Sequence, residues 1–255
     1  MAENEEKRPL AEHEHKKVVR DGDAVLKQFD STYPKANVFN EALNQVRVEE
    51  TDLNLPHVRD VRQHDGEWTI VMDYIPGKTM AEKMEEDPEH AEDYIRQLVE
   101  LQCEVHDHEA PDLLPSLREK MRRKLASGEL PVDPSERYEL QSRLDSMPRH
   151  KKLIHGDFEP RNIIYGEDGK MYIIDWSHAS RGNASADAAK TYMVLMLQHG
   201  KDLADFYLNE FSQEAEIPKQ LIQRWTPLMA ASHLLRTNER HKEFLMGWLD
   251  VMEGQ

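Results

Sequence analysis

A short strand-rich segment at residues 151–176 stands between two stretches of predicted helix. Its apolar runs, 153–154, 163–165 and 171–174, are separated by polar and glycine-containing loops. Runs this short, bounded by turn residues, predict β-strands rather than helices. Loops at strand ends hold polar side chains rigidly and leave them accessible. We therefore expect this segment to carry functional groups.

The first 75 residues have the pattern of a small antiparallel sheet. A β-rich run on each side of the Asp21-Gly22 turn is a hairpin signal, and a second Asp-Gly pair follows at 65–66. Apolar residues at helical spacing predict one helix over 38–48. The predicted strands are 16–19, 24–29, 57–62 and 68–72.

Beyond Pro76-Gly77 the apolar residues recur at three- and four-residue intervals, which is typical of amphipathic helices. The predicted helices are 88–107, 113–126, 135–146, 184–199, 201–213, 217–235 and 239–252. The sequence thus predicts an α+β chain of two lobes, 1–75 and 78–255, with a hinge at about 72–77.

The charge balance limits the class of partner. There are 49 acidic and 33 basic side chains, a net charge of −16. Such a surface repels nucleic-acid backbones and anionic lipids, so we expect neither nucleic acid nor a membrane as a partner. The basic cluster at 118–124 includes Glu119 and apolar residues at helical spacing, which indicates a solvated helix face.

Cysteine content and hydropathy indicate a cytoplasmic protein. A single cysteine, Cys103, excludes an intrachain disulfide. No stretch reaches the roughly 18 to 20 apolar residues that a membrane span needs, and residues 1–7 lack the apolar core of a signal peptide.

The segment 151–176 carries three side chains suited to phosphoryl transfer. It contains Asp157, Asn162 and Asp175, each beside an apolar run. Transfer from a nucleotide needs one carboxylate to orient and deprotonate the attacking hydroxyl. It also needs hard oxygen ligands for Mg²⁺, commonly a carboxylate and an amide carbonyl. The sequence supplies each of these groups.

The spacing of these residues resembles a known family. The motif His155-Gly156-Asp157 is followed by Asn162, five residues after Asp157, and by an Ile-Asp-Trp motif whose Asp175 is eighteen residues after Asp157. This pattern resembles the aminoglycoside phosphotransferase and choline kinase family. The resemblance implies a bilobal protein-kinase-like fold. It implies that Asp157 is the catalytic base, that Asn162 and Asp175 bind Mg²⁺, and that His155 and Asp187 are structural supports, with Asp187 expected to cap its helix.

The same resemblance places a nucleotide, ATP or GTP, in the N-terminal lobe. Lys27, in the predicted strand 24–29, resembles the lysine that reaches the α- and β-phosphates. Glu41, on the predicted helix, is at the position of its ion-pair partner. Together they imply a phosphate-binding ion pair.

The hinge at 72–77 is implied to hold the adenine. Backbone groups of Asp73 and Ile75 would form hydrogen bonds with the base, and the side chains of Met72 and Tyr74 would enclose it. A plain strand end is the alternative interpretation of this segment.

One segment departs from the family pattern. Residues 10–16 stand where a glycine-rich phosphate loop is expected, yet they contain no glycine and two acids, Glu12 and Glu14. Glycine permits close approach of backbone to phosphate, and carboxylates repel it. A kinase-like binding or regulatory protein without turnover therefore stays open beside an active kinase.

The acceptor is implied to be a hydroxyl of a small polar molecule, with cationic compounds such as aminoglycosides or choline among the candidates. Carboxylates in the C-terminal part either line a pocket for a cationic acceptor or lie on solvated helix faces. These residues are Asp202, Asp205, Glu210, Glu239 and Asp250. A protein-directed kinase is disfavoured because Ile-Asp-Trp replaces Asp-Phe-Gly, and a monomer and a dimer are both compatible with the sequence.

Overall fold

The computed structural model describes residues 8–235 and 239–250, and the chain divides into two compact units. The first unit comprises residues up to 83 together with 160–179, and the second comprises 84–159 and the residues from 180 onward. Packing thus assigns 160–179 to the first unit, whereas the predicted lobes were continuous. The reason is strand pairing, because β8 (Ile163–Gly166) pairs with β6 (Gly77–Thr79).

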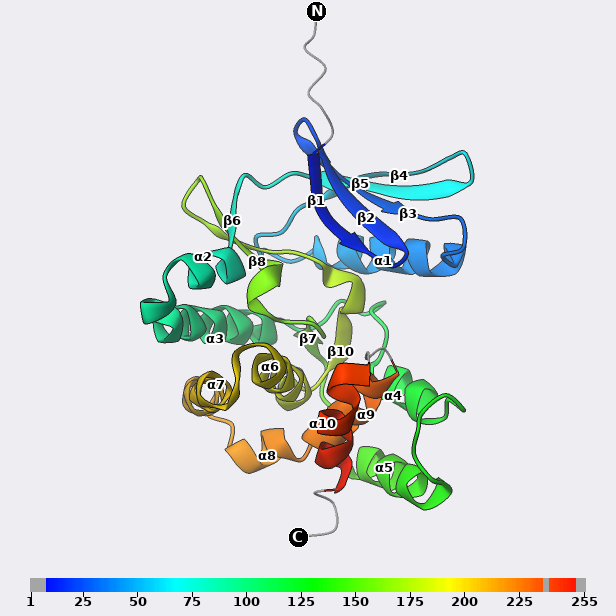
Figure 1. Ribbon diagram of the computed structural model, residues 1–255, viewed down its shortest axis with the longest axis vertical. Coiled ribbons are helices and arrows are strands. Elements are labelled where there is room, and N and C mark those ends of the chain that lie inside the picture. Colours follow the sequence, from blue (N-terminus) through cyan, green and yellow to red (C-terminus); the bar gives the residue numbers. More distant parts are fainter. Residues whose placement is uncertain (1–7, 236–238, 251–255) are drawn as a thin grey trace, which may run out of the picture. The chain divides into compact units, whose positions relative to one another are not determined.

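A five-stranded antiparallel sheet forms the main part of the first unit. Its strand order is β1-β2-β3-β5-β4, and α1 (Lys35–Val48) covers one face (Figure 1). The strands are β1 (Arg8–His13), β2 (Lys16–Asp21), β3 (Ala24–Phe29), β4 (Val58–His64) and β5 (Glu67–Asp73). The sequence did not predict β1. This edge strand is exposed wherever its burial is described, so it lacks the apolar alternation that marks a half-buried strand.

Register places a lysine within the apolar face of this sheet. The face under α1 packs Phe29, Ile70 and Met72 against helix residues. Lys27 lies opposite Ile70 in the β3–β5 ladder, and side chains alternate along a strand, so Lys27 shares the face of Phe29. Glu41 is buried on the facing side of α1. The fold therefore brings an acid and a base together under the sheet.

A three-stranded sheet completes the first unit. Its order is β6-β8-β9, with β9 at Met171–Ile173, and short 3-10 turns lie at Pro160–Asn162 (η2) and Trp176–His178 (η3). Gly77 is required in β6, because a Cβ there would lie 2.1 Å from the carbonyl oxygen of Tyr165. This sheet positions Asn162 before one strand and Asp175 after another.

The second unit is mainly helical. Its only strands among the described residues are β7 (Lys152–Ile154) and β10 (Ser180–Gly182), which pair with each other. The remaining helices, the first of which crosses the boundary between the units, are α2 (Met80–Glu86), η1 (Pro88–His90), α3 (Ala91–Asp107), α4 (Leu117–Leu125), α5 (Pro134–Ser146), α6 (Ala184–His199), α7 (Lys201–Glu214), α8 (Lys219–Gln223), α9 (Thr226–Leu234) and α10 (Glu239–Asp250). Across 8–235 and 239–250, no helix has the length and apolar character needed to cross a membrane.

Two expectations about this unit are wrong. The helix predicted over 217–235 is broken between α8 and α9, where Pro227 occupies the first turn of α9 and cannot continue a preceding helix. The cluster at 118–124 is not a fully solvated face. The Arg118 side chain is only 12% exposed, and its guanidinium donates to the carbonyls of Leu144 and Met147 at the end of α5.

Candidate active site

A buried ion-pair centre lies between the sheet and α1 in the first unit. The Nζ of Lys27 donates to Oε1 of Glu41 at 2.9 Å and to Oδ1 of Asp175 at 3.0 Å. These residues come from β3, from α1 and from the segment after β9. The structure thus brings together three residues that the sequence predicted for nucleotide and metal binding.

Both ends of the Lys27–Asp175 pair stay charged at neutral pH. Burial disfavours the ammonium, but the carboxylates of Asp175 and Glu41 outweigh it and raise the pKa of Lys27 above its ordinary value. Burial also disfavours the carboxylate, yet Lys27 and Lys16 hold the pKa of Asp175 well below its ordinary value. A charged, partly desolvated centre is therefore ready to meet an ionic ligand.

Asp175 has an unusual backbone. Its φ and ψ are 62° and 57°, the left-handed region that non-glycine residues seldom occupy. A residue held there costs of order 1 kcal/mol or more, and such residues cluster at functional sites. The bonds from Lys27 hold the carboxylate in this conformation.

Lys16 belongs to the same centre, and the sequence did not predict it. Its Nζ lies 3.6 Å from Oε1 of Glu41 and 3.8 Å from Oδ2 of Asp175. The hairpin register was the missed signal. Val18 lies opposite Lys27, so Lys16, two residues from Val18, faces the same side as Lys27. We call Lys16, Lys27, Glu41 and Asp175 the Lys27 centre.

The segment that departs from the family pattern is a strand and a tight turn. β1 ends at His13 and β2 begins at Lys16, which leaves Glu14 and His15 as the turn. His15 Nδ1 lies 2.9 Å from a carboxylate oxygen of Asp30 at the end of the hairpin. The position expected for a glycine-rich loop therefore offers side chains in place of glycine backbone.

The predicted catalytic loop begins directly after β7, in the second unit. His155 is fully buried, and its Nδ1 accepts a hydrogen bond from the backbone N–H of Asp157 at 3.2 Å. Its ring meets the ring of Phe158 edge to face at 5.7 Å between centroids. His155 therefore braces the loop through a nitrogen that is not available for proton transfer.

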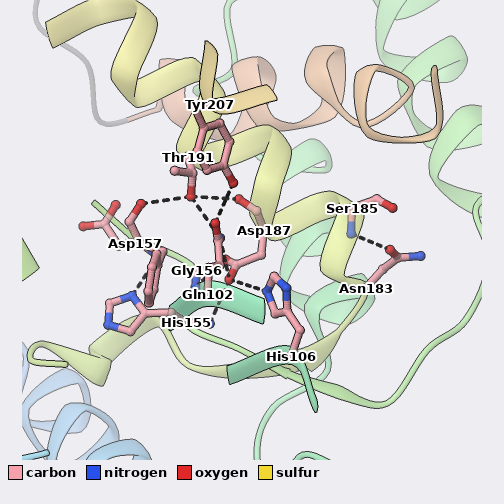
Figure 2. A network of polar contacts seen from close by, with 11 residues as sticks. Gln102, His106, His155, Gly156, Asp157, Asn183, Ser185, Asp187, Thr191 and Tyr207 are labelled. Atoms are coloured by element: carbon pink, nitrogen blue, oxygen red, sulfur yellow. Dashed lines mark hydrogen bonds and ion pairs between the residues drawn. The ribbon is translucent and has the colours of Figure 1, made fainter. Parts of the chain in front are cut away.

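Asp187 is the main support of this loop (Figure 2). One carboxylate oxygen accepts the N–H of Gly156 at 2.7 Å, and the other accepts the N–H of His155 at 3.2 Å and Nε2 of His106 at 3.0 Å. The expectation that Asp187 caps its helix is wrong. Asn183 is the cap, and its side chain accepts the N–H of Ser185.

Neutral side chains extend this support. Gln102 donates to the Thr191 hydroxyl at 3.1 Å (Figure 2). That hydroxyl in turn donates to the main-chain carbonyl of Phe158 at 2.9 Å. Tyr207 donates to Gln102 from the other side. Burial opposes the charge on Asp187, but the hydrogen bond from His106 and further favourable contacts hold its pKa below the ordinary value. We call Asp187, the side chains of His106, Gln102, Thr191 and Tyr207, and the backbone N–H groups of His155 and Gly156 the Asp187 network.

Asp157 presents its carboxylate at the loop surface. Its side chain is 31% exposed, and Oδ1 lies 3.6 Å from Nζ of Lys190 on α6. Lys190 also lies 2.9 Å from Nδ1 of His233 on α9. No sequence signal points to Lys190 or His233, since each is an ordinary polar residue of a predicted helix.

The two predicted metal ligands lie in the first unit. Asn162 is buried, and its main-chain carbonyl oxygen accepts the N–H of Ile174 at 2.9 Å, which ties it to the residue before Asp175. Among the described residues, no three His, Cys, Asp or Glu side chains gather into a metal-binding group. The assignment of Asn162 and Asp175 as metal ligands therefore stays a prediction.

The predicted hinge contributes to a separate cavity. Met72 is buried in the core under α1, whereas Asp73, Tyr74 and Ile75 line a cavity of about 790 Å³. The carboxylate of Asp73 accepts Nε of Arg59 at 2.6 Å. None of the four residues of the Lys27 centre lines this cavity, so the adenine contacts of the hinge stay a prediction.

Acidic residues proposed for the acceptor have other contacts. Asp205 accepts the hydroxyl of Tyr192 at 3.0 Å and pairs with Lys201, and Glu210 lies 3.4 Å from Arg96. The Asp205–Tyr192 and Glu210–Arg96 contacts link neighbouring helices, and the Asp205–Lys201 pair lies within one turn of α7. Such contacts are typical of solvated helix faces. The side chains of Glu239 and Asp250 lie outside the described residues.

Comparison of the whole fold with solved structures finds similar folds among aminoglycoside phosphotransferases and a choline kinase. The chain is similar to aminoglycoside phosphotransferase APH(4)-Ia, with 16% identity, a TM-score of 0.73 and coverage of 98% of this chain and 94% of that one. It is also similar to choline kinase LicA from Streptococcus pneumoniae, with 14% identity, a TM-score of 0.65 and coverage of 96% of this chain and 93% of that one. For ADP-bound aminoglycoside phosphotransferase APH(2'')-Ib the identity is 14%, the TM-score is 0.61, and the coverage is 99% of this chain and 93% of that one. The likeness confirms the predicted protein-kinase-like fold.

Sequence comparison identifies the family. A search of curated proteins gives no match. The family model described as "APH: Phosphotransferase enzyme family" matches residues 9–228, which include the Lys27 centre, the catalytic loop and the Asp187 network. On this match the chain belongs to the APH phosphotransferase enzyme family.

Proposed function

We propose that the protein transfers the γ-phosphate of ATP, with Mg²⁺, to a hydroxyl of a small polar molecule. The single observation that carries the proposal is the bridging of Glu41 and Asp175 by Lys27, at 2.9 and 3.0 Å. A lysine of the third strand that pairs with an acid on the neighbouring helix, together with an Asp that binds Mg²⁺, is the arrangement that protein kinases use for phosphoryl transfer. GTP is the alternative donor.

Two ammonium groups would hold the phosphates. In the Lys27 centre, Lys16 and Lys27 face two carboxylates, so their charges balance before a nucleotide binds. An arriving triphosphate adds negative charge, and each lysine can then turn toward phosphate oxygen. Lys16, next to the glycine-free turn, supplies a charge-assisted donor where a glycine-rich loop would offer backbone N–H groups.

Asp175 and Asn162 would hold Mg²⁺. A carboxylate and an amide are hard oxygen donors, and phosphate oxygens and water complete such a site. A backbone hydrogen bond from the N–H of Ile174 to the main-chain carbonyl of Asn162 ties the residue before Asp175 to Asn162 within the first unit. When bound, the ion would neutralise charge that develops on the transferred phosphate.

Asp157 would orient the acceptor hydroxyl and take its proton. The bond from its N–H to His155 and the two bonds from Asp187 to the preceding residues fix the loop backbone. Lys190 lies beside the carboxylate, with its Nζ 3.6 Å from Oδ1 of Asp157, and helps to hold it in position. Fixed position supplies most of the catalysis in a transfer of this kind.

The acceptor class follows from the similar proteins. One similar structure is a ternary complex of APH(4)-Ia with ADP and hygromycin B, and another is a choline kinase. We therefore place aminoglycosides and choline first in an acceptor panel, followed by macrolides, thiamine and sugars. If an aminoglycoside is the acceptor, phosphorylation would inactivate an antibiotic.

The test is phosphate transfer from labelled ATP across this panel. Asp157→Asn is expected to lower turnover by about 10²- to 10⁴-fold, because it removes the proton acceptor and keeps the side-chain size. Glu129→Gln, a change at an exposed carboxylate of the same unit, should leave turnover unchanged. Full turnover by Asp157→Asn on an identified acceptor would reject the proposal.

A kinase-like binding protein without turnover is the second candidate, favoured by the glycine-free turn at Glu14 and His15. Thermal-shift measurements separate the two. MgATP should raise the melting temperature of a kinase, whereas a protein that does not bind nucleotide would show no shift with ATP or GTP.

A further inference from the structure

The second unit contains a cavity of about 320 Å³ with a strongly basic lining. The start of α4, the segment before β7, β10 and the start of α6 form it. Among the described residues that line the cavity, five have fully charged cationic side chains, and Glu119 is the only one with a carboxylate. The five are Arg118, Arg122, Arg149, Lys151 and Arg181. In a chain of net charge −16, this reverses the general sign of the surface.

Acidic neighbours compensate only part of this charge. Asp145 lies 2.6 Å from Arg122 and 3.6 Å from Arg118, so one carboxylate serves two guanidiniums. Arg118 otherwise donates to backbone carbonyls, and Arg181 donates to the carbonyl of Asp112 at 3.2 Å. Carbonyl oxygens hold a guanidinium in place without cancelling its charge.

Two of the cations form no close ion pair within the described chain. The side chains of Arg149 and Lys151 form no hydrogen bond or ion pair with a residue of 8–235 or 239–250. Both are exposed and line the cavity. They are therefore available to an anion from solution.

The pKa of Arg118 is a second indication that positive charge is in excess around the cavity. Its pKa lies below the ordinary value, first because of burial and then because Arg149 and Arg122 repel its charge more strongly than Asp145 attracts it. An anion in the cavity would relieve this repulsion. The beginning of α6 adds a further positive contribution, because Gly182 and Asn183 line the cavity at the N-terminus of that helix.

We propose that this basic cavity binds a small phosphate-bearing molecule at a site distinct from the Lys27 centre. Arg149 and Lys151 would contact the phosphate directly, and Arg118 and Arg181, held by backbone carbonyls, would form the fixed part of the site. The size of the cavity is at the lower end for small-molecule pockets. The acidic remainder of the surface repels a long polyanion such as RNA, which favours a small ligand.

The test is titration of the full-length protein with inorganic pyrophosphate in EDTA, followed by calorimetry. The wild type is expected to bind with a dissociation constant below about 1 mM. Arg149→Gln/Lys151→Gln removes the two uncompensated cations and should weaken binding by about tenfold or more. These side chains are exposed and have no protein partner, so folding should be unaffected, which circular dichroism checks.

Two controls make the result specific. Arg62→Gln/Arg123→Gln removes the same charge from exposed positions outside the cavity and should change affinity less than about twofold. Lys27→Met should leave pyrophosphate binding at the cavity intact. The proposal is overturned if the wild type does not bind, if Arg149→Gln/Lys151→Gln binds like the wild type, or if only Lys27→Met loses binding.

Discussion

The Lys27 centre and the Asp187 network both hold an aspartate in a desolvated place, but they satisfy it differently. Asp175 meets two ammonium groups, and its side chain is 29% exposed. Asp187 meets two backbone N–H groups and His106, and its side chain is fully buried. Ion pairs at a partly exposed place can exchange partners when a charged ligand arrives, whereas a buried carboxylate bound to backbone cannot.

This difference indicates that the two regions have different roles, ligand binding for the Lys27 centre and structural support for the Asp187 network. The Lys27 centre has charges that a nucleotide and a metal can take over, so it is suited to a ligand site. The Asp187 network consists of short-range bonds to the loop backbone, so it is suited to keeping Asp157 in place. The predictions below test this separation, beginning with the largest expected change in stability.

Removal of the buried carboxylate should have the largest effect. Asp187→Ala leaves the N–H groups of His155 and Gly156 without their acceptor, and we expect the free energy of unfolding to fall by about 3 kcal/mol. Urea denaturation measures it. The exposed Asp202→Ala is the control and should unfold like the wild type; equal stability of the two variants would contradict a supporting role for Asp187.

Lys27→Met should reduce nucleotide binding more than stability. It leaves Glu41 and Asp175 facing only Lys16. Because Lys16 still compensates them in part, we expect the unfolding free energy to fall by less than the roughly 3–5 kcal/mol that a fully broken buried ion pair costs. The melting-temperature increase caused by MgATP should disappear. An unchanged increase would show that the Lys27 centre does not bind the nucleotide.

Acid should weaken both regions. The pKa values of Asp175 and Asp187 lie below the ordinary 3.8, so their stabilising effect is present above about pH 3.8 and is lost as the pH falls below it. The pKa of Lys27 is raised above the ordinary 10.5, so its contribution is full below about pH 10.5 and is lost in stronger alkali. Urea denaturation at a series of pH values should therefore show a plateau between these limits, and Asp187→Asn should have a shallower decline in acid than the wild type.

Lys16→Gln should have the smallest effect. The second ammonium is more distant from its carboxylates than that of Lys27, so we expect the KM for ATP to rise by about two- to tenfold with little change in turnover number. Lys17→Gln, on the exposed side of the same strand, is the matched control. Equal effects of the two changes would remove Lys16 from the site.

Much of the fold was predictable because its elements have local signals. The Asp-Gly turns marked the hairpins, and α3, α5, α6 and α7 began and ended close to the predicted residues. Signals failed where a neighbour decided the conformation. The edge strand β1 has no apolar face to reveal it, and Pro227 ended a helical pattern that periodicity alone had extended.

The sequence by itself determined the chemical groups: a lysine in a strand, an acid on the following helix, and an Asp, Asn and Asp at fixed spacing around short strands. These follow from local order along the chain. Only the tertiary structure decided which other charges join them, namely Lys16 beside Asp175, Lys190 beside Asp157 and the cations around the basic cavity. Such contacts join residues far apart in sequence, and strand register and helix packing, rather than local propensity, determine their distances.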